Sequence, residues 1–395
     1  MMPVILSKVA VIFRLSLSHI LFYIVLCTLF FSANAFSANT ALQKDNSVAS
    51  DTAMTIKLNV DALRQQYSQP QSSWPLVITA DGKKAEPLAP LTPKAPLGSA
   101  TLIQLGKTLF HDPILSSDKT ISCASCHNAN TLFQDGRGQS IGVDEQKGER
   151  NAPAILGIDH WESFFWDGRA STASQQALMP IVNPIEMNLP IPEALKRLNK
   201  SQAYQAKFND AFGTLPITAD MLATALVEFE RSIPAPSTRY QHFIHEVASD
   251  PTNAHTLFTD NELLGLHLFR TKAKCMTCHE GALLSDNEFH VTGFHLYGRR
   301  FEDLGRVNAT SNNEDIGKFR TPSLLGVTHT KPWMHNGLFV EFTPMIMQYN
   351  AGGFRPKPRG KFKHDPHFPE TTALIQPLGL TKSEISALVD FLHTL

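Results

Sequence analysis

Cysteines repeat one short pattern at two places in this chain. Cys-Ala-Ser-Cys-His occupies residues 123–127, and Cys-Met-Thr-Cys-His occupies residues 275–279. Two thiols three positions apart can each add to one vinyl group of a haem, and the histidine that follows can bind its iron. One copy would also fit a redox dithiol or half of a zinc site, but two copies favour two covalently attached c-type haems. The residues expected to attach the haems and bind their irons are Cys123, Cys126, His127, Cys275, Cys278 and His279.

The first 35 residues have the features of a secretory signal peptide. Lys8 and Arg14 precede an apolar run over residues 20–31, and Ala-Asn-Ala at residues 33–35 forms a small-x-small cleavage site. Cys27, the one cysteine outside the haem motifs, would be removed with this leader. An uncleaved membrane anchor is the alternative. Because bacteria attach c-type haem outside the cytoplasm, leader and motifs agree, and we expect a periplasmic protein.

Composition narrows the classes of function. Lys and Arg number 35 and Asp and Glu 36, so the net charge of −1 gives no support for nucleic-acid binding. No apolar run after the leader is long enough to span a bilayer. A chain of 395 residues has room for two domains, each with its own core.

Helical periodicity accounts for most of the regular structure that we expect. Leu102, Leu105 and Leu109 predict a helix over residues 99–110, directly before the first haem motif. Thr218 or Asp220 would cap a helix over residues 221–233. Further helices are expected at residues 191–212, 221–233, 261–270, 342–349 and 382–392.

A weak internal repeat indicates how the helices are organised. Gly-x-x-Leu-Phe ends the helix before each haem motif, at residues 106–110 and 265–269, and chance is the alternative explanation. We therefore expect a mainly α fold of two cytochrome c-like haem domains packed face to face. The expected divisions are a signal peptide (1–35), an N-terminal extension with a proline-rich linker (36–97), a first haem domain (98–235) and a second haem domain (236–395). The extension looks loosely structured.

Further short motifs follow one another in a recognisable order. They are Arg-Asn-Ala-Pro at 150–153, Phe-Trp-Asp-Gly-Arg-Ala at 165–170, Asn-Pro-Ile-Glu-Met at 183–187, Phe-Arg-Thr-Pro-Ser-Leu at 319–324 and Pro-Trp-Met-His-Asn-Gly at 332–337. With the haem motifs, they make the sequence resemble the bacterial di-haem cytochrome c peroxidases and their MauG-type relatives. The resemblance covers residues 98–395 and does not choose between the two branches.

The resemblance implies that the first haem domain (98–235) is peroxidatic, so that hydrogen peroxide reacts at its haem, and that the second (236–395) is the electron-transfer domain. Glu186 matches the base that moves a proton between the two peroxide oxygens. Gln176 matches a glutamine that hydrogen-bonds near the iron-bound oxygen, and Pro180 a proline on the same side. Trp166 matches a tryptophan between the haems, and Arg169 would pair with a haem propionate. Four of these residues have a structural alternative. Glu186 could be a surface carboxylate, Gln176 a helix-surface glutamine and Trp166 a core aromatic. Arg169 could form a surface salt bridge.

A calcium ion between the haem domains is also implied by the resemblance. An asparagine side chain and two backbone carbonyls supply its ligands, which map to Asn151, Thr330 and Pro332. Oxygen ligands of this kind suit a hard cation. A turn asparagine and an ordinary loop are the structural alternatives.

Two departures from the peroxidase pattern concern the far sides of the haems. Switching peroxidases carry a histidine after the first haem motif, but residues 128–159 contain none and Val143 stands at that spacing. We therefore expect an open first haem with His127 as its only protein ligand. His160 is the nearest alternative ligand, and we interpret it as structural.

The second haem has three candidate far-side ligands. Spacing from His335, which we expect to support the pocket without binding iron, favours Tyr349, as in MauG-type enzymes. Met345 and Met347 remain alternatives, as the peroxidases use methionine. Methionine raises a haem potential, whereas tyrosinate should lower it and help to hold an oxidised iron.

Three functions are compatible with these residues. The first is reduction of hydrogen peroxide with electrons from a small periplasmic cytochrome c or cupredoxin, in an enzyme that, like its family, could form a homodimer. The second is a MauG-type enzyme that uses peroxide to oxidise residues of a partner protein. The third is a non-enzymatic electron carrier, which Glu186 and Gln176 at an open haem argue against.

Overall fold

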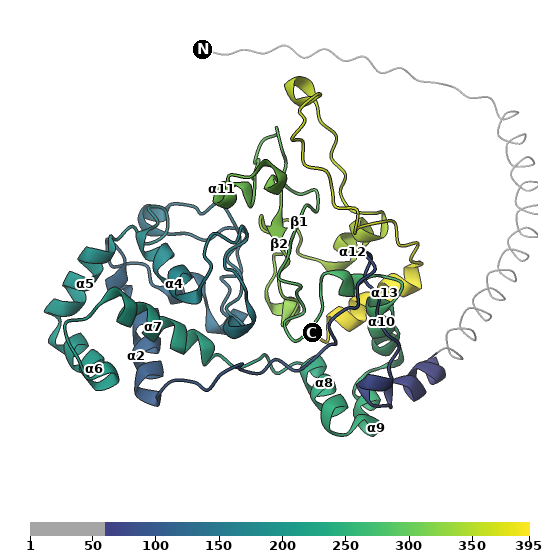
Figure 1. The fold of residues 1–395 in the computed structure, drawn as a ribbon, viewed down its shortest axis with the longest axis horizontal. Coiled ribbons are helices and arrows are strands. Elements are labelled where there is room, and N and C mark those ends of the chain that lie inside the picture. Colours follow the sequence, from purple (N-terminus) through teal and green to yellow (C-terminus); the bar gives the residue numbers. More distant parts are fainter. Residues whose placement is uncertain (1–59) are drawn as a thin grey trace, which may run out of the picture. The chain divides into compact units, whose positions relative to one another are not determined.

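The computed structural model describes residues 60–395, so the predicted leader and residues 36–59 of the extension lie outside the described part (Figure 1). The described chain is mainly α-helical, as expected. Its one regular sheet has two antiparallel strands, β1 (Phe289–His290) and β2 (Phe319–Arg320). No helix within residues 60–395 is both long and apolar enough to cross a membrane.

One group of helices surrounds the first haem motif. Its core consists of leucine, isoleucine and aromatic side chains such as Leu109, Phe110 and Phe208, all fully buried. Short helix α3 (Cys123–Cys126) presents the two cysteines beside this core. The other helices are α2 (Ala100–His111), α4 (Ala173–Val182), α5 (Ile191–Lys200), α6 (Gln202–Phe212) and α7 (Ala219–Arg231).

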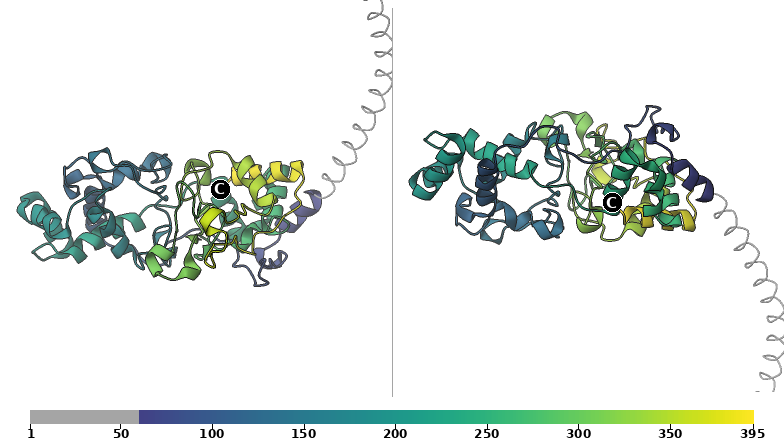
Figure 2. Two further views of the ribbon diagram at one scale, coloured as in Figure 1. Left: turned by 90° about the horizontal axis from the view of Figure 1, so that it is seen from above. Right: turned by 90° about the horizontal axis from the view of Figure 1, so that it is seen from below.

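A second group of helices surrounds the second haem motif. In both views of Figure 2, the blue and teal helices of the first group lie at one end, and the green and yellow helices of the second group lie at the other. Its central pair is α10 and α13, which pack along each other. The helices of this group are α8 (Arg239–Ser249), α9 (Pro251–Ala254), α10 (Asp260–Arg270), α11 (Val307–Thr310), α12 (Phe342–Asn350) and α13 (Lys382–Leu392).

The Gly-x-x-Leu-Phe repeat has the same structural role in both groups. A Cβ on Gly106 of α2 would lie 1.8 Å from the Ala225 carbonyl oxygen of α7. A Cβ on Gly265 of α10 would lie 2.0 Å from the Ala387 carbonyl oxygen of α13. Only glycine lets the two backbones approach so closely. Each haem motif is therefore preceded by a helix that crosses a later helix at a glycine.

Helix boundaries match the periodicity well, with one break. The helix predicted over residues 191–212 is two helices, because Ser201 leaves the helical conformation and its side chain accepts a hydrogen bond from the Tyr204 amide as the cap of α6. Thr218, rather than Asp220, caps α7. Helices α4 and α8 were not anticipated.

The expectation of a loose extension is wrong for residues 63–90. Tyr67 meets Trp74 edge to face at 4.7 Å, and the Arg270 guanidinium of α10 donates to the Tyr67 hydroxyl at 2.9 Å. The Ala80 amide donates to Thr277 Oγ1, inside the second haem motif. Aromatic packing therefore fixes this segment on the second group of helices.

Candidate active site and haem sites

Both haem-motif histidines have the same hydrogen bond. His127 Nδ1 donates to the Phe133 carbonyl at 2.8 Å, and His279 Nδ1 donates to the Leu284 carbonyl at 3.0 Å. This bond fixes the tautomer and leaves Nε2 with a free lone pair, as an iron ligand requires. Burial lowers the pKa of both rings, which keeps them neutral. Phe133 and Leu284 each adopt a left-handed backbone that turns the loop back onto the ring.

The second haem motif opens into a large, mainly apolar cavity. Cys275, Cys278 and His279 line it, and so do Met345 and Tyr349 of α12. The four haem-motif cysteines are unpaired and partly buried, so no disulfide competes for them. An apolar cavity beside two thiols and a neutral histidine fits a covalently attached haem.

Arg320 of β2 gives this cavity an unmatched positive charge. The side chain is 7% exposed, and its Nε and Nη1 have no hydrogen-bond partner among the described residues. Its guanidinium stacks 3.6 Å from the Trp161 ring, and burial lowers its pKa to about 9. A buried, unpaired guanidinium is costly unless an anion pairs with it. The carboxylates of a haem are anions of the right kind, so the donor set of the cavity fits the group.

The first haem motif is accompanied by two carboxylates from different elements. Glu186 lies in the loop after α4, and Glu230 lies on α7. Burial raises the pKa of the Cys123 thiol, and the charges of Glu230 and Glu186 add to the rise. Both acids therefore lie within electrostatic range of the cysteine that would attach the haem.

Glu186 is held in place by its side chain and by its backbone. Asn183 Nδ2 donates to Glu186 Oε1 at 2.6 Å, and the Val143 amide donates to the Glu186 carbonyl at 2.9 Å. Burial raises the pKa of Glu186, while the Arg169 charge and the Asn183 bond oppose the rise. A positioned carboxyl group with a raised pKa is suited to accepting and returning a proton.

The loop that carries Val143 packs tightly on the Glu186 loop. A Cβ on Gly142 would lie 2.1 Å from the Ile185 carbonyl oxygen, so only glycine fits there. Val143 is 1% exposed. Val143 is therefore a buried aliphatic side chain that packs against the Glu186 backbone.

Gln176 and Pro180 share one face of α4. They are four residues apart and both half-buried. The Pro180 carbonyl accepts from the amide of Met187, next to Glu186. Helix α4 thus brings this face close to the Glu186 loop.

Trp166 lies in the wall of the second haem cavity. Its indole is 9% exposed, and Nε1 donates to the Asn151 carbonyl at 2.8 Å. It meets His335 edge to face, and His335 stacks on Phe319 at 3.7 Å. His335 is buried in the same wall, and burial lowers its pKa to about 4.

A four-residue charge network joins the two groups of helices. Arg150 donates to both carboxylate oxygens of Asp303, at 2.7 and 2.8 Å, and to Asp167 at 2.6 Å. Asp167 also accepts from Arg169, whose guanidinium stacks 3.6 Å from the Phe165 ring. Arg169 is therefore already paired, whereas Arg320 has no carboxylate partner among residues 60–395.

The residues mapped to calcium belong to the lining of the second haem cavity. Asn151, Thr330 and Pro332 all line it. Asn151 Nδ2 donates to the Arg137 carbonyl at 2.7 Å, which turns Oδ1 the other way. Across the described chain, no donor reaches Asn151 Oδ1 or the carbonyls of Thr330 and Pro332. Three oxygen atoms without donors are compatible with a hard cation.

The three residues that could bind the iron of the second haem opposite His279 differ in how far they are exposed to solvent. Met345 and Tyr349 lie one turn apart on the face of α12 that lines the cavity, whereas Met347 is 56% exposed and points away. Burial raises the pKa of Tyr349, and the charges of Cys278 and Cys275 add to the rise. The phenol would therefore ionise only beside a cation.

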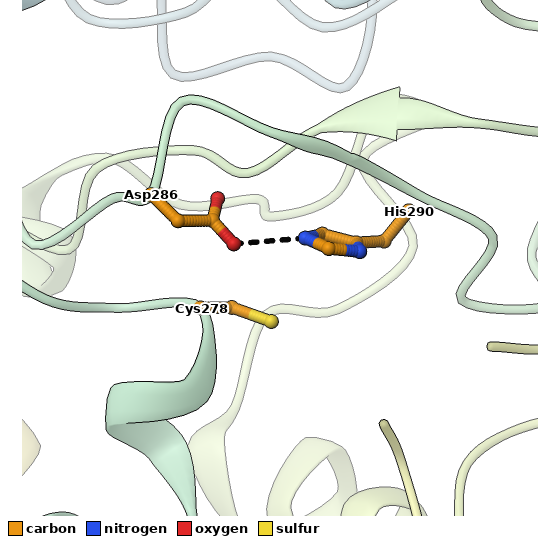
Figure 3. Close-up of side chains that lie close together, drawn as sticks. All are labelled: Cys278, Asp286 and His290. Carbon is orange, nitrogen blue, oxygen red and sulfur yellow. Dashed lines mark hydrogen bonds and ion pairs between the residues drawn. The ribbon is translucent and has the colours of Figure 1, made fainter. Parts of the chain in front are cut away.

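Cys278, Asp286 and His290 lie close enough to suggest a metal site (Figure 3). The figure shows His290 bonded to the Asp286 carboxylate, with the Cys278 sulfur beside the pair, and that bond is 2.8 Å long. Cys278 belongs to the second haem motif, where its sulfur would form a thioether. We therefore interpret Asp286 and His290 as a polar pair in the haem pocket.

Two haem-attachment motifs, each beside its own group of helices, are the arrangement expected for a protein with two c-type haem domains. Comparison with known proteins supports this interpretation. A family profile described as di-haem cytochrome c peroxidase matches residues 100–249. The cytochrome c551 peroxidase of Nitrosomonas europaea is 32% identical over 261 residues, which are 66% of this chain and 75% of that protein.

Two further relatives carry the MauG name. The methylamine utilization protein MauG of Methylorubrum extorquens is 28% identical over 89% of both chains. A crystal structure described as a MauG-like protein associated with microbial copper homeostasis is 30% identical, has a TM-score of 0.65 and covers 80% of this chain and 94% of that one. The chain belongs to the di-haem cytochrome c peroxidase family, whose members are peroxidases that carry two haem c groups.

Sequence reasoning missed Glu230 and Arg320. Glu230 follows Leu226 by four residues and therefore shares its buried helix face, a signal that was available in the sequence. Arg320 lies in the quoted Phe-Arg-Thr-Pro-Ser-Leu motif, but nothing in the sequence separated it from Arg169 as the arginine without a partner.

Proposed function

We propose that this protein reduces hydrogen peroxide to water at its first haem, with Glu186 as the proton-transferring group. The reaction consumes two electrons and two protons for each peroxide and yields two waters. The bound haem would supply the coordination position and the electrons for cleavage of the O–O bond. The observation that carries the proposal is the half-buried Glu186 carboxyl, with a raised pKa and a fixed position near Cys123.

Glu186 would accept the proton of the near peroxide oxygen and return it to the far one, so that the leaving group is water. Asn183 holds one carboxyl oxygen, which leaves the other free for the proton. Gln176 and Pro180 would border the same space, with the Gln176 amide orienting peroxide. Buried Val143 brings no side-chain ligand to this side, which supports an open site.

Electrons would enter at the second haem from a small periplasmic cytochrome c or cupredoxin. Trp166 would carry them onward, since its buried indole lines the second cavity and its chain neighbour Asp167 joins the Arg150 network. We assign a propionate of the second haem to Arg320 and a calcium ion to Asn151, Thr330 and Pro332. The haem irons would take His127 and His279, and a leader over residues 1–35 would export the chain.

The test is the variant Glu186→Gln. It keeps the size and the Asn183 contact of the side chain but cannot take up a proton. We expect both haems to remain attached and peroxide turnover to fall by about 10²–10⁴-fold, the usual contribution of a positioned acid–base group. Gln175→Glu on the exposed face of α4 is the matched control and should keep full activity. Full activity in Glu186→Gln would remove Glu186 from the reaction.

A MauG-type oxidation of a partner protein is the second candidate, and Tyr349 is the observation that favours it. Its phenol lines the second cavity beside Cys275 and Cys278. Addition of one equivalent of peroxide to the fully oxidised, calcium-loaded protein separates the two. A rapid change in the haem spectra supports the MauG-type reaction and an open first haem, whereas a reaction that requires prior reduction supports the cytochrome-fed peroxidase. A simple electron carrier would show neither.

A further inference from the structure

A strongly basic loop projects from the second haem domain. Residues 354–369 contain Arg355, Lys357, Arg359, Lys361 and Lys363 against one carboxylate, Asp365, which gives 5 − 1 = +4 in a chain of net charge −1. All five cationic residues are exposed to solvent. Figure 1 shows the loop as the yellow-green projection that leaves the domain beside α12.

The loop is held by packing, so its charges have a defined position. Tyr297 donates to Asp365 at 2.6 Å and meets Phe362 and Phe368 edge to face, at 5.4 and 5.6 Å. A Cβ on Gly298 would lie 2.5 Å from the Phe362 ring, so the aromatic ring lies directly on this backbone. The side chains of Lys357 and Lys363 take part in none of these contacts, and Lys361 Nζ lies 4.9 Å from the centroid of the Phe362 ring.

Both ends of the loop run into the wall of the second haem cavity. Tyr349 of α12 precedes it, and Thr372 and Ile375 follow it, and all three line the cavity. Arg355 donates to the Gly352 and Ile375 carbonyls and so ties the two ends together. A protein that binds the loop would therefore lie beside the second haem.

Apolar side chains accompany the loop at its base. Phe354 stacks on Phe294, which meets Phe339 edge to face, and the flanking residues Leu338 and Val340 are 55% and 54% exposed. A small apolar contact beside a charged rim is typical of short-lived protein–protein interfaces.

We propose that residues 354–369 are the docking surface for an electron-donor protein with an acidic face. The proposal rests on the proposed function, since it names the donor that would feed the second haem. Complementary charge would steer the donor onto the loop, and the apolar residues at its base would make the contact. The donor must carry clustered Asp and Glu around its exposed redox centre.

The test measures reduction of the second haem without peroxide. Reduced flavodoxin, a small acidic protein of low potential, is mixed with the oxidised full chain in a stopped-flow instrument, and the haem spectrum is followed. The variant Lys357→Glu/Lys361→Glu/Lys363→Glu reverses three charges. Lys107→Glu/Lys200→Glu/Lys207→Glu is the control, with the same change of net charge on exposed residues of α2, α5 and α6.

We expect the loop variant to be reduced about tenfold more slowly than the wild type at low salt, and the control variant nearly normally. The difference should shrink at about 0.5 M salt, where charges are screened within a few ångströms. Free reduced flavin should reduce both variants like the wild type. An equal loss in both variants, no loss in the loop variant, a salt-independent rate or a loss that persists with free flavin would overturn the proposal. Because no peroxide is used, its failure is independent of the test on Glu186.

Discussion

Glu230 allows a prediction that needs neither peroxide nor a redox partner. Its carboxyl lies on α7 at 6% exposure, and Oε2 has no hydrogen-bond partner among the described residues. Burial alone raises its pKa from the model-compound value of 4.5 to about 8. The folded protein therefore binds a proton that the unfolded chain has released, over the whole range between these two pKa values.

The sign of the pH effect follows from this difference in protons. Between pH 4.5 and 8 the folded state holds more protons than the unfolded state, so the free energy of unfolding falls as the pH rises. With about 1.4 kcal/mol per pKa unit, the loss between pH 5 and pH 8 is about 3 kcal/mol at most. For a domain of this size, that loss is a shift of roughly 6–12 °C in the midpoint of thermal unfolding.

The variant Glu230→Gln isolates this contribution, since glutamine has the same shape and does not titrate. We expect its thermal midpoint, followed by circular dichroism, to equal that of the wild type near pH 5 and to exceed it increasingly towards pH 8. Asp210→Asn, at an exposed position of α6, is the control and should show no such gain towards pH 8. A difference between Glu230→Gln and the wild type that does not change with pH would refute the assignment of a buried, proton-binding acid.

Three further outcomes follow from contacts in the haem sites. Gly142→Ala should lose about 1–3 kcal/mol of stability and most peroxide turnover, because its Cβ would meet the Ile185 carbonyl; Gly148→Ala, with 3.4 Å of space, should keep both. Arg320→Gln should lower the potential of the second haem by roughly 40–90 mV in a spectroelectrochemical titration, as expected for loss of a charge worth about 1–2 kcal/mol, and Arg320→Lys should not. Chelation of calcium should lower the thermal midpoint of the wild type, and added Ca²⁺ should restore it, but neither should affect Asn151→Ala.

The sequence predicted the parts of the fold that depend on local patterns. Helix spans followed from leucine periodicity, and the break at Ser201 was missed because a serine can serve either as a helix residue or as a cap. Gly106 and Gly265 were recognised as a repeat, but their reason is a crossing with α7 and α13, and no local pattern contains a residue more than a hundred positions away. The packing of Tyr67 on Arg270 was missed for the same reason.

The candidate site likewise contains residues that local patterns predicted and residues that became recognisable only in the folded chain. Haem attachment by four cysteines and two histidines could be read directly, since covalent chemistry fixes their spacing. The roles of Glu186 and Gln176 came from family resemblance. Only the folded chain shows which arginine lacks a carboxylate partner, because charge pairing depends on tertiary structure. Arg169 pairs with Asp167, whereas Arg320 stacks on the Trp161 ring.

The two haem domains use equivalent helix pairs but opposite charges. Glu186 and Glu230 accompany the first haem motif, whereas Arg320 faces the cavity of the second. The buried Glu230 carboxyl, whose pKa burial raises to about 8, would hold a proton at neutral pH, and protons would be needed where peroxide becomes water. A buried cation stabilises a reduced haem and so favours electron entry. In the proposed function, the charge difference would put proton storage in the first domain and electron capture in the second, beside the basic loop where an acidic donor would bind.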